Sequence, residues 1–267
     1  MPLAREILCK TALTKTGIPG FQYCLNPYVG CTHSCVYCYA SFMGRFTGHR
    51  EPWGTYADAK VNIAAVLKKQ LNARRVPEGK VIISSVTDAY QPAEAHYGLT
   101  RSCLEELAGC PSLEVEILTK SALVIRDLSI LKEMPRCSVG FTVTTMDEKA
   151  ARVFEPGASP PGLRLAAARQ LVEAGIAVWV FIAPVLPGVG DSEEALAALF
   201  KELKRAGVQE VMADTLNPYP AVLHRLKKVY RAHYPAALAA LELCAANPGL
   251  YRESMQNSLR LLGAGLI

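Results

Sequence analysis

The sequence predicts an α/β protein built from six consecutive β-α units. Two observations predict this class. Short apolar runs typical of buried strands alternate with longer stretches of helical character, and the 267 residues suit an α/β barrel, which commonly forms one domain at this length. Because 51% of the residues are hydrophobic, a sizeable core can form. Repeated β-α units favour a parallel sheet.

The individual elements follow from local patterns. The predicted strands are residues 22–29, 81–86, 113–119, 138–144, 176–183 and 210–213, and the predicted helices are residues 56–74, 99–108, 125–134, 164–174 and 192–206. Gly175 and Gly207 stand where glycines end helices, and Ser192 with Glu194 marks a helix start. Residues 156–162, rich in proline and glycine, predict a loop. We expect residues 235–262 to be helical as well.

Three cysteines on one short segment are the strongest chemical signal in the chain. Cys31, Cys35 and Cys38 have the spacing cysteine-x3-cysteine-x2-cysteine, with Tyr37 directly before the last cysteine. Three thiolates can hold three irons of a four-iron cluster and leave the fourth iron open, whereas four cysteines would close it. An open metal position indicates a site where a small molecule binds and reacts.

A structural zinc site is the alternative interpretation of the same cysteines. In that case His33 or Cys24 supplies the fourth ligand of a closed tetrahedral site. The paired cysteine knuckles usual for zinc are absent from the sequence. Nine cysteines, an odd number scattered along the chain, also argue against a disulfide framework and for a reducing compartment.

The cysteine segment resembles the radical S-adenosylmethionine (radical SAM) superfamily. Further motifs, Thr87-Asp-Ala-Tyr-Gln-Pro-Ala-Glu94, Thr119-Lys-Ser121, Arg126-Asp127, Glu155-Pro156 and Ala183-Pro-Val-Leu-Pro-Gly188, are similar to its spore photoproduct lyase-like (DNA repair photolyase-like) branch. The resemblance covers about residues 20–215. It implies a partial (β/α)6 TIM-like barrel over residues 1–215, including an N-terminal extension, with a helical C-terminal extension over residues 216–267 packed on it.

The resemblance also implies the cofactors and the type of reaction. A [4Fe-4S] cluster held by Cys31, Cys35 and Cys38 would cleave S-adenosylmethionine to a 5'-deoxyadenosyl radical, which abstracts hydrogen from a substrate. In the lyases a cysteine at the end of the second barrel strand returns hydrogen to the repaired base. The position that we match to it is Ser85, whose O–H bond is too strong for this role. The sequence names no catalytic residue and leaves the substrate open.

Candidate cofactor-binding residues follow the predicted strands, because the carboxyl ends of barrel strands build active sites. Ser85, Thr87 and Asp88 follow one strand and suit hydrogen bonds to an amino group or ribose, although turn residues that bond their own backbone explain them equally simply. Lys120 follows an apolar strand and suits the carboxylate of the cofactor. The other candidates are Tyr37, Thr142, Thr144, Glu155, Arg164 and Pro184. For Glu155 and Arg164, a salt bridge that closes their loop is the alternative.

Two classes of function therefore remain open. The first is a radical SAM enzyme that acts on a nucleic-acid base, with a peptide or a small metabolite as the second choice of substrate. The second is a non-enzymatic metal protein that binds nucleic acid through residues 223–234, where cations alternate with aromatic residues at helical spacing. A basic helix packed on the barrel explains the same pattern.

Partners and location follow from composition and from the resemblance. An electron donor such as flavodoxin or ferredoxin is implied by the family. The net charge of +5 is compatible with an anionic substrate, but it does not by itself indicate nucleic acid. No apolar run approaches the roughly 18 to 20 residues that span a bilayer, and the first residues lack the layout of a secretory signal. We therefore expect a cytoplasmic protein without membrane partners.

Overall fold

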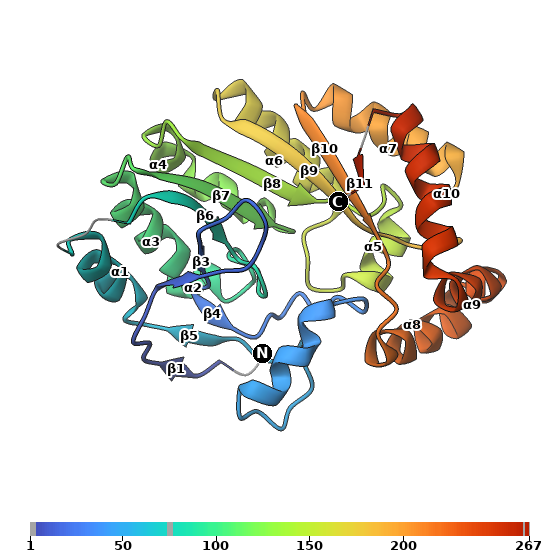
Figure 1. Cartoon of the computed structure of the whole chain (residues 1–267), viewed down its shortest axis with the longest axis horizontal. Helices are drawn as coiled ribbons and strands as arrows, with labels where there is room; N and C mark the ends of the chain where they lie inside the picture. The colour runs from blue at the N-terminus through green and yellow to red at the C-terminus, as the bar shows by residue number, and fades with distance from the viewer. Residues whose placement is uncertain (1–3, 74–76, 264, 267) are drawn as a thin grey trace.

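A curved, mostly parallel sheet with helices on its outer side forms the body of the protein (Figure 1). The computed structural model describes residues 4–73, 77–263 and 265–266. The six central strands are β3 (Tyr23–Leu25), β6 (Gly79–Ile83), β7 (Leu113–Thr119), β8 (Cys137–Thr142), β9 (Ala177–Val185) and β10 (Glu210–Thr215), all parallel and hydrogen-bonded in this order. These correspond to the six predicted strands, and the partial-barrel class is confirmed. The strand expected over 22–29 is too long, because β3 ends at Leu25 and Tyr28–Val29 belongs to a separate sheet.

The two edges of this sheet and a second small sheet were not predicted. β2 (Leu13–Lys15) pairs antiparallel with β3 at one edge, and β11 (Gly265–Leu266) pairs parallel with β10 at the other. Within the described residues the sheet therefore stays open between β2 and β11. A separate three-stranded sheet joins β1 (Glu6–Ile7), β5 (Asp58–Lys60) and β4 (Tyr28–Val29) next to the cysteine segment.

Helices connect the strands and continue beyond the last one. They are η1 (Tyr39–Phe46), α1 (Ile63–Leu71), α2 (Glu94–Tyr97), α3 (Leu99–Ala108), η2 (Ala122–Asp127), α4 (Leu128–Lys132), α5 (Glu148–Phe154), α6 (Pro161–Glu173), α7 (Glu193–Arg205), α8 (Pro220–His233), η3 (Pro235–Ala237), α9 (Leu238–Ala246) and α10 (Pro248–Leu261). Ser192 caps α7 by accepting a hydrogen bond from the backbone N–H of Ala195. Gly175 and Gly207, with positive φ, end α6 and α7 as expected.

Two predicted helices are partly wrong. The helix expected over 125–134 is divided between the 3-10 helix η2, which ends at Asp127, and α4, which ends at Lys132. Residues 56–62 do not belong to the helix expected over 56–74, because Asp58–Lys60 forms the middle strand of the small sheet. The expected end, Arg74, lies outside the described residues. The predicted loop over 156–162 is also too long by two residues, since Pro161 opens α6 at the position where a missing N–H costs nothing.

Two hydrophobic cores support the region at the carboxyl ends of the strands. The larger core lies between the sheet and its helices and includes Val81, Ile117 and Val180. The second core joins α5, α8 and α9, and Tyr37 of the cysteine segment is buried in it. The C-terminal helices α8 and α9 therefore pack against the cysteine segment. In the part of the chain that the structure describes, no helix is both long enough and apolar enough to cross a membrane.

Candidate active site

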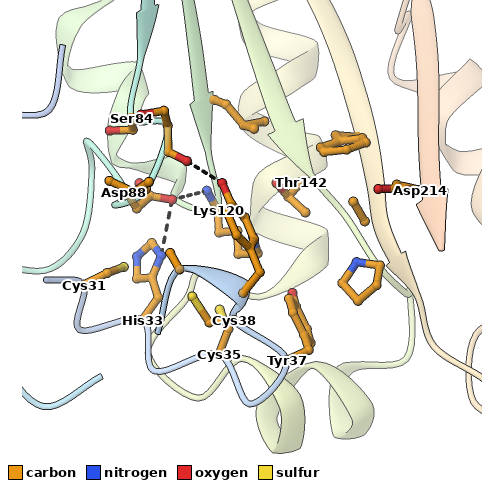
Figure 2. A pocket seen from close by; sticks show the side chains of 18 of the residues that line it. Cys31, His33, Cys35, Tyr37, Cys38, Ser84, Asp88, Lys120, Thr142 and Asp214 are labelled. Carbon is orange, nitrogen blue, oxygen red and sulfur yellow. Dashed lines mark hydrogen bonds and ion pairs between the residues drawn. The ribbon is translucent and has the colours of Figure 1, made fainter. Parts of the chain in front are cut away.

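A cavity of about 370 Å³ lies between the carboxyl ends of the central strands and the cysteine segment (Figure 2). Its lining includes Cys31, His33, Cys35, Tyr37, Cys38, Tyr39, Ser84, Ser85, Val86, Thr87, Asp88, Lys120, Thr142, Phe181, Pro184, Asp214, Thr215, Asn217 and Tyr219. The strands are parallel, so their carboxyl ends meet at one edge and bring together residues far apart in the chain. This position is where barrel enzymes place their chemistry.

All three cysteines of the motif line this cavity as free thiols. Burial raises the pKa of the Cys35 thiol to about 12, against the opposing effect of the Lys120 ammonium. The thiols must therefore lose protons when they bind metal. Among the described residues, no three His, Cys, Asp or Glu side chains converge on a single ion. The thiolates of a cubane cluster each bind a different iron, so they do not need to converge in that way.

The segment that carries the cysteines is shaped by close backbone packing. Gly30 has φ +86°, and a Cβ at this position would lie 2.6 Å from Tyr56. Gly157 is packed still more tightly, because a Cβ there would lie 2.3 Å from the carbonyl oxygen of Thr32. The N–H of Gly157 donates to the carbonyl of His33 at 2.9 Å. The Glu155-Pro-Gly157 motif thus lets a second loop lie directly against the cysteines.

Gln91 links the cysteine segment to the loop that follows β6. Its Oε1 accepts a hydrogen bond from the N–H of Thr32 at 2.9 Å, and its Nε2 donates to the carbonyl of Gly30 at 3.2 Å. The side chain is fully buried. A buried amide that satisfies two backbone groups positions the cysteine segment against the barrel.

Arg225 of α8 is a second anchor, and the sequence did not single it out. Its guanidinium donates to the carbonyls of Val36 and Cys38, both at 3.0 Å, and to Ser41 Oγ at 3.1 Å. Nearby Lys227 pairs with Glu242 of α9 at 3.0 Å. Two cations of the basic helix, Arg225 and Lys227, therefore have partners within the protein itself. The packed-helix explanation accounts for these two residues.

We expect Arg225→Gln to release metal bound by the cysteine segment about tenfold faster than the wild type, because groups that orient metal ligands typically have effects of this size. The measurement is the rate of metal loss after a chelator is added to metal-loaded protein under anaerobic conditions. Lys228→Gln is the control, since Lys228 is exposed on the same helix. Equal release rates for wild type and Arg225→Gln would contradict an anchoring role.

The wall of the cavity after β6 is built around Asp88. Its carboxylate accepts hydrogen bonds from Thr119 Oγ1 at 2.6 Å, from the N–H of Lys120 at 2.7 Å and from the N–H of Tyr90 at 2.9 Å. His33 Nδ1 lies 3.3 Å from Asp88 Oδ2, close enough for an ion pair but not aligned as a hydrogen bond. Burial raises the pKa of Asp88, but the nearby His33 and the hydrogen bonds from Thr119 and Lys120 lower it by more, so the net shift is downward.

Ser85 and Thr87 of the same wall are bound to Asn26, which follows β3. Asn26 Nδ2 donates to Ser85 Oγ at 3.1 Å, and Asn26 Oδ1 accepts from Thr87 Oγ1 at 3.3 Å. The carbonyl of Ser85 accepts from Tyr39 Oη at 2.5 Å. Both residues line the cavity, and both hydroxyls already have partners within the protein.

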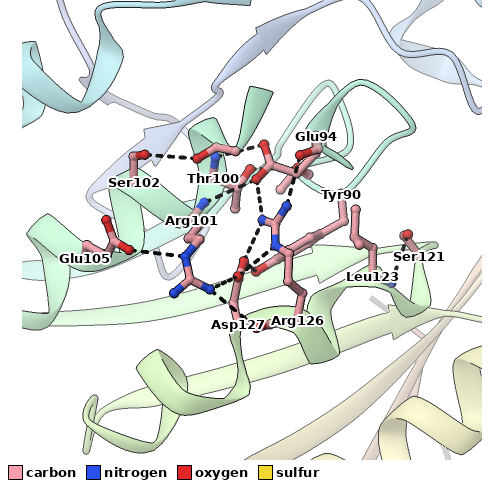
Figure 3. A network of polar contacts seen from close by, with 12 residues as sticks. Tyr90, Glu94, Thr100, Arg101, Ser102, Glu105, Ser121, Leu123, Arg126 and Asp127 are labelled. Atoms are coloured by element: carbon pink, nitrogen blue, oxygen red, sulfur yellow. Dashed lines mark hydrogen bonds and ion pairs between the residues drawn. The ribbon is translucent and has the colours of Figure 1, made fainter. Parts of the chain in front are cut away.

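A network of ion pairs and hydrogen bonds around the buried carboxylates of Glu94 and Asp127 connects the loop after β6 to the segment after β7 (Figure 3). Arg126 donates to Glu94 Oε1 at 2.6 Å and to Asp127 Oδ2 at 2.9 Å. Tyr90 Oη donates to the same Asp127 oxygen at 3.1 Å, and Glu94 Oε2 accepts from the N–H of Thr100 at the start of α3. Arg126 and Asp127 therefore pair beyond their own helix, and they fasten the loop after β6 to the barrel.

Lys120 points into the cavity from the end of β7 (Figure 2). Its Nζ lies 5.7 Å from the centroid of the Tyr37 ring, within range of a cation–π contact. Burial lowers the pKa of Lys120, but Cys35, Glu155 and Asp88 raise it by more, so the ammonium stays charged. A charged ammonium in a cavity is a binding group for an anion such as a carboxylate.

The remaining candidate residues divide into two groups. Tyr37, Thr142 and Pro184 line the cavity. Thr144, Glu155 and Arg164 lie outside its lining, since Arg164 and Glu155 form a buried ion pair and Thr144 Oγ1 donates to Glu155 Oε1 at 3.2 Å. Tyr37 Oη also donates to Glu155. Of the two interpretations of this pair, the structure shows the salt bridge, which supports Tyr37 from behind.

Other residues that line the cavity were not among the predicted cofactor-binding residues. Tyr39 and Tyr219 lie at the cavity from opposite ends of the chain and are about half exposed, at 52% and 50%. Asp214 and Asn217 also line it from β10 and the loop that follows. Each of these residues lies at or just after a strand end or directly after the last cysteine, a positional signal that could have identified them.

Comparisons with known proteins agree with this arrangement. The model of the radical SAM superfamily matches residues 25–200. An uncharacterized protein of Methanocaldococcus jannaschii is 35% identical over 188 residues, which are 70% of each chain. Spore photoproduct lyase of Bacillus subtilis is 24% identical over 239 residues, 87% of this chain and 66% of the lyase.

A solved structure supports the fold. A spore photoproduct lyase variant with bound AdoMet and dinucleoside spore photoproduct superimposes with a TM-score of 0.67 at 21% identity, over 85% of this chain and 66% of that chain. This chain thus spans about two thirds of the length of the lyases that it matches. The family model covers well over half of the sequence, and the relative from M. jannaschii exceeds 30% identity. This chain belongs to the radical SAM superfamily.

Proposed function

We propose that this radical SAM enzyme holds a [4Fe-4S] cluster through Cys31, Cys35 and Cys38 and abstracts hydrogen from a nucleic-acid base. The observation that carries the proposal is the convergence of the three thiols and the Lys120 ammonium on one cavity. The donor set fits the group, because three thiolates leave one iron open for S-adenosylmethionine. When bound, the cluster and S-adenosylmethionine supply a 5'-deoxyadenosyl radical.

The residues of the cavity have distinct tasks in this proposal. Lys120 binds the carboxylate of S-adenosylmethionine, and Thr142 of the neighbouring strand β8 and Pro184 of β9 continue the cavity wall beside it. Asp88 is saturated with hydrogen bonds and keeps its loop in place. The buried pair of Glu155 and Arg164 supports Tyr37. The protein thereby orients the reactants and excludes water from them.

A nucleic-acid base as substrate is supported by the aromatic residues at the cavity. Tyr39 and Tyr219 are half exposed there, and tyrosine rings are common stacking partners for unpaired bases. The lyase that superimposes on this chain was solved with a dinucleoside spore photoproduct. Ser85 offers no thiol, and its hydroxyl accepts a hydrogen bond from Asn26. We therefore propose that hydrogen is not returned from this position.

The protein must also receive an electron, and we propose that a flavodoxin or a ferredoxin supplies it. The segment directly after Cys38 reaches the surface in η1, where Phe42 is 44% and Phe46 is 68% exposed. Arg45 lies between them, with its guanidinium carbon 4.9 Å from the centroid of the Phe46 ring. This surface is near the cysteines and suits an acidic redox protein.

The proposed reaction is tested with anaerobically reconstituted and reduced protein. S-adenosylmethionine is added with or without dinucleoside spore photoproduct, and 5'-deoxyadenosine and the repaired dinucleoside are quantified. Cleavage with a changed dinucleoside supports a base as substrate. Cleavage without any change in the dinucleoside would direct the search to peptides or small metabolites. Zinc in place of iron, without cleavage, would contradict the proposed function.

Lys120→Ala is expected to weaken the binding of S-adenosylmethionine about tenfold or more, because a hydrogen bond between charged groups contributes about 1.5–3 kcal/mol. The measurement is equilibrium binding by anaerobic calorimetry. Lys132→Ala, at an exposed lysine of α4, is the matched control. Unchanged affinity in Lys120→Ala would remove Lys120 from the binding site, without affecting membership of the family.

A further inference from the structure

The wall after β6 contains one polar side chain that has no partner. Ser85 and Thr87 are bonded to Asn26, and Asp88 accepts three hydrogen bonds. Ser84 Oγ, in contrast, is buried and makes no hydrogen bond in the protein. The residue is 4% exposed and lines the cavity. A buried hydroxyl without a partner is costly, so it indicates a group that a ligand satisfies.

The backbone of Ser84 is strained as well. Its φ is +75°, and among the described residues only Ser34 is another non-glycine residue with positive φ. The N–H of Ser84 donates to the carbonyl of Leu25 at 3.0 Å, which holds this conformation at the end of β6. Glycine adopts positive φ without steric cost, whereas serine does not. Strain retained at a cavity wall is typical of functional positions.

We propose that the Ser84 hydroxyl is a hydrogen-bond partner for the nucleoside part of S-adenosylmethionine. This inference rests on the proposed function. Figure 2 shows Ser84 at the strand end of the cavity, with Asp88 and Lys120 between it and the cysteines. The amino and carboxylate groups of the cofactor belong at the cysteine end, beside Lys120. The groups of the cofactor that remain at the Ser84 end are the ribose hydroxyls and the adenine. The serine hydroxyl can donate a hydrogen bond to them or accept one from them.

The test uses two probes, S-adenosylmethionine and 5'-deoxyadenosine, because the second contains only the nucleoside part. We expect Ser84→Ala to bind both probes about five- to tenfold more weakly than the wild type, in keeping with the loss of one hydrogen bond. Lys120→Ala should weaken S-adenosylmethionine but leave 5'-deoxyadenosine unchanged. Both affinities are measured by calorimetry on the reconstituted protein under anaerobic conditions.

A second variant separates the lost hydroxyl from a change in folding. Ser84→Gly also lacks the hydroxyl, but it relieves the strained φ and should unfold at a higher temperature than Ser84→Ala. If the hydroxyl binds the nucleoside, both variants lose the same affinity despite their different stability. Ser138→Ala, at the opposite end of the sheet in β8, is the control for a serine outside the cavity.

Three results would overturn the proposal. The first is a Ser84→Ala protein that binds 5'-deoxyadenosine within about twofold of the wild type. The second is a loss of affinity in Ser84→Ala that Ser84→Gly restores, since this would assign the effect to strain. The third is wild-type protein that binds neither probe and cleaves no S-adenosylmethionine. The third result alone would also remove the proposed function.

Discussion

Cys35→Ala is expected to abolish the cleavage of S-adenosylmethionine and to lower the iron content of the reconstituted protein. The reason is that two protein thiolates bind a cubane cluster less tightly than three. Cys35 is the middle cysteine of the motif, and it lines the cavity together with the other two. The measurement is the amount of 5'-deoxyadenosine formed, together with iron and sulfide per chain, in both proteins under anaerobic conditions.

Cys137→Ala is the matched control for this experiment. Cys137 is also a half-buried free thiol, but it begins β8 at the end of the strand remote from the cavity, and it does not line the cavity. We expect it to keep wild-type iron and wild-type cleavage. Full cleavage by Cys35→Ala would contradict the assignment of the cluster ligands. Equal losses in both variants would point to general damage from removing a thiol.

Arg164→Met is expected to lower the free energy of unfolding by about 3–5 kcal/mol, the usual cost of breaking a buried ion pair. The Arg164 side chain is 1% exposed and donates to the carbonyls of Thr142 at 2.8 Å and Ser159 at 2.6 Å, besides its pairing with Glu155. The variant leaves the Glu155 carboxylate buried without its cation. Denaturant unfolding of both proteins gives the difference.

The control for this prediction is an exposed ion pair on a neighbouring helix. Arg152 pairs with Glu148 at 3.2 Å in α5, and its side chain is 78% exposed. We expect Arg152→Met to cost less than about 1 kcal/mol, as is usual for surface pairs. A similarly small effect of Arg164→Met would show that the buried pair does not stabilise the loop behind Tyr37.

The same pair predicts a dependence on pH. Burial raises the pKa of Glu155, but Arg164 and Lys120 lower it by more, so its folded-state pKa lies below the usual value. The unfolded chain therefore binds the proton more tightly. The stabilisation is complete above the usual carboxyl pKa of about 4.3 and is lost as the pH falls through the folded-state value. The difference between wild type and Arg164→Met should accordingly shrink in acid.

Local sequence patterns predicted the elements whose pattern of buried residues matches the packing in the folded protein, such as β7 and α3. β7 alternates buried and partly buried residues along its whole length, and the predicted bounds 113–119 match it. The bounds 99–108 likewise match α3, whose apolar residues recur with helical spacing. In contrast, Asp58–Lys60 became a strand because β1 and β4 lie on either side of it. No local pattern contains that information.

The site shows the same division. The order of polar residues after strands predicted part of the cavity wall, including Ser85, Asp88 and Lys120, because parallel strands end at one edge. It did not predict which hydroxyl stays without a partner. Asn26 donates a hydrogen bond to Ser85 from 59 positions away in the sequence, whereas the Ser84 hydroxyl makes no hydrogen bond in the protein. Glu155 and Arg164, which the sequence offered as cofactor ligands or as a salt bridge, form the salt bridge in the structure.

The family, the six β-α units and the cysteine motif can all be predicted from the amino-acid sequence, because these depend on spacing along a short stretch or on repeated local patterns. What holds the cysteine segment in place becomes visible only once the chain is folded. Arg225 reaches Val36 across 189 positions of the sequence, and Gln91 reaches Gly30 across 61. Such contacts form when distant segments pack together, and the hydrogen bonds that result are specified by the fold as a whole.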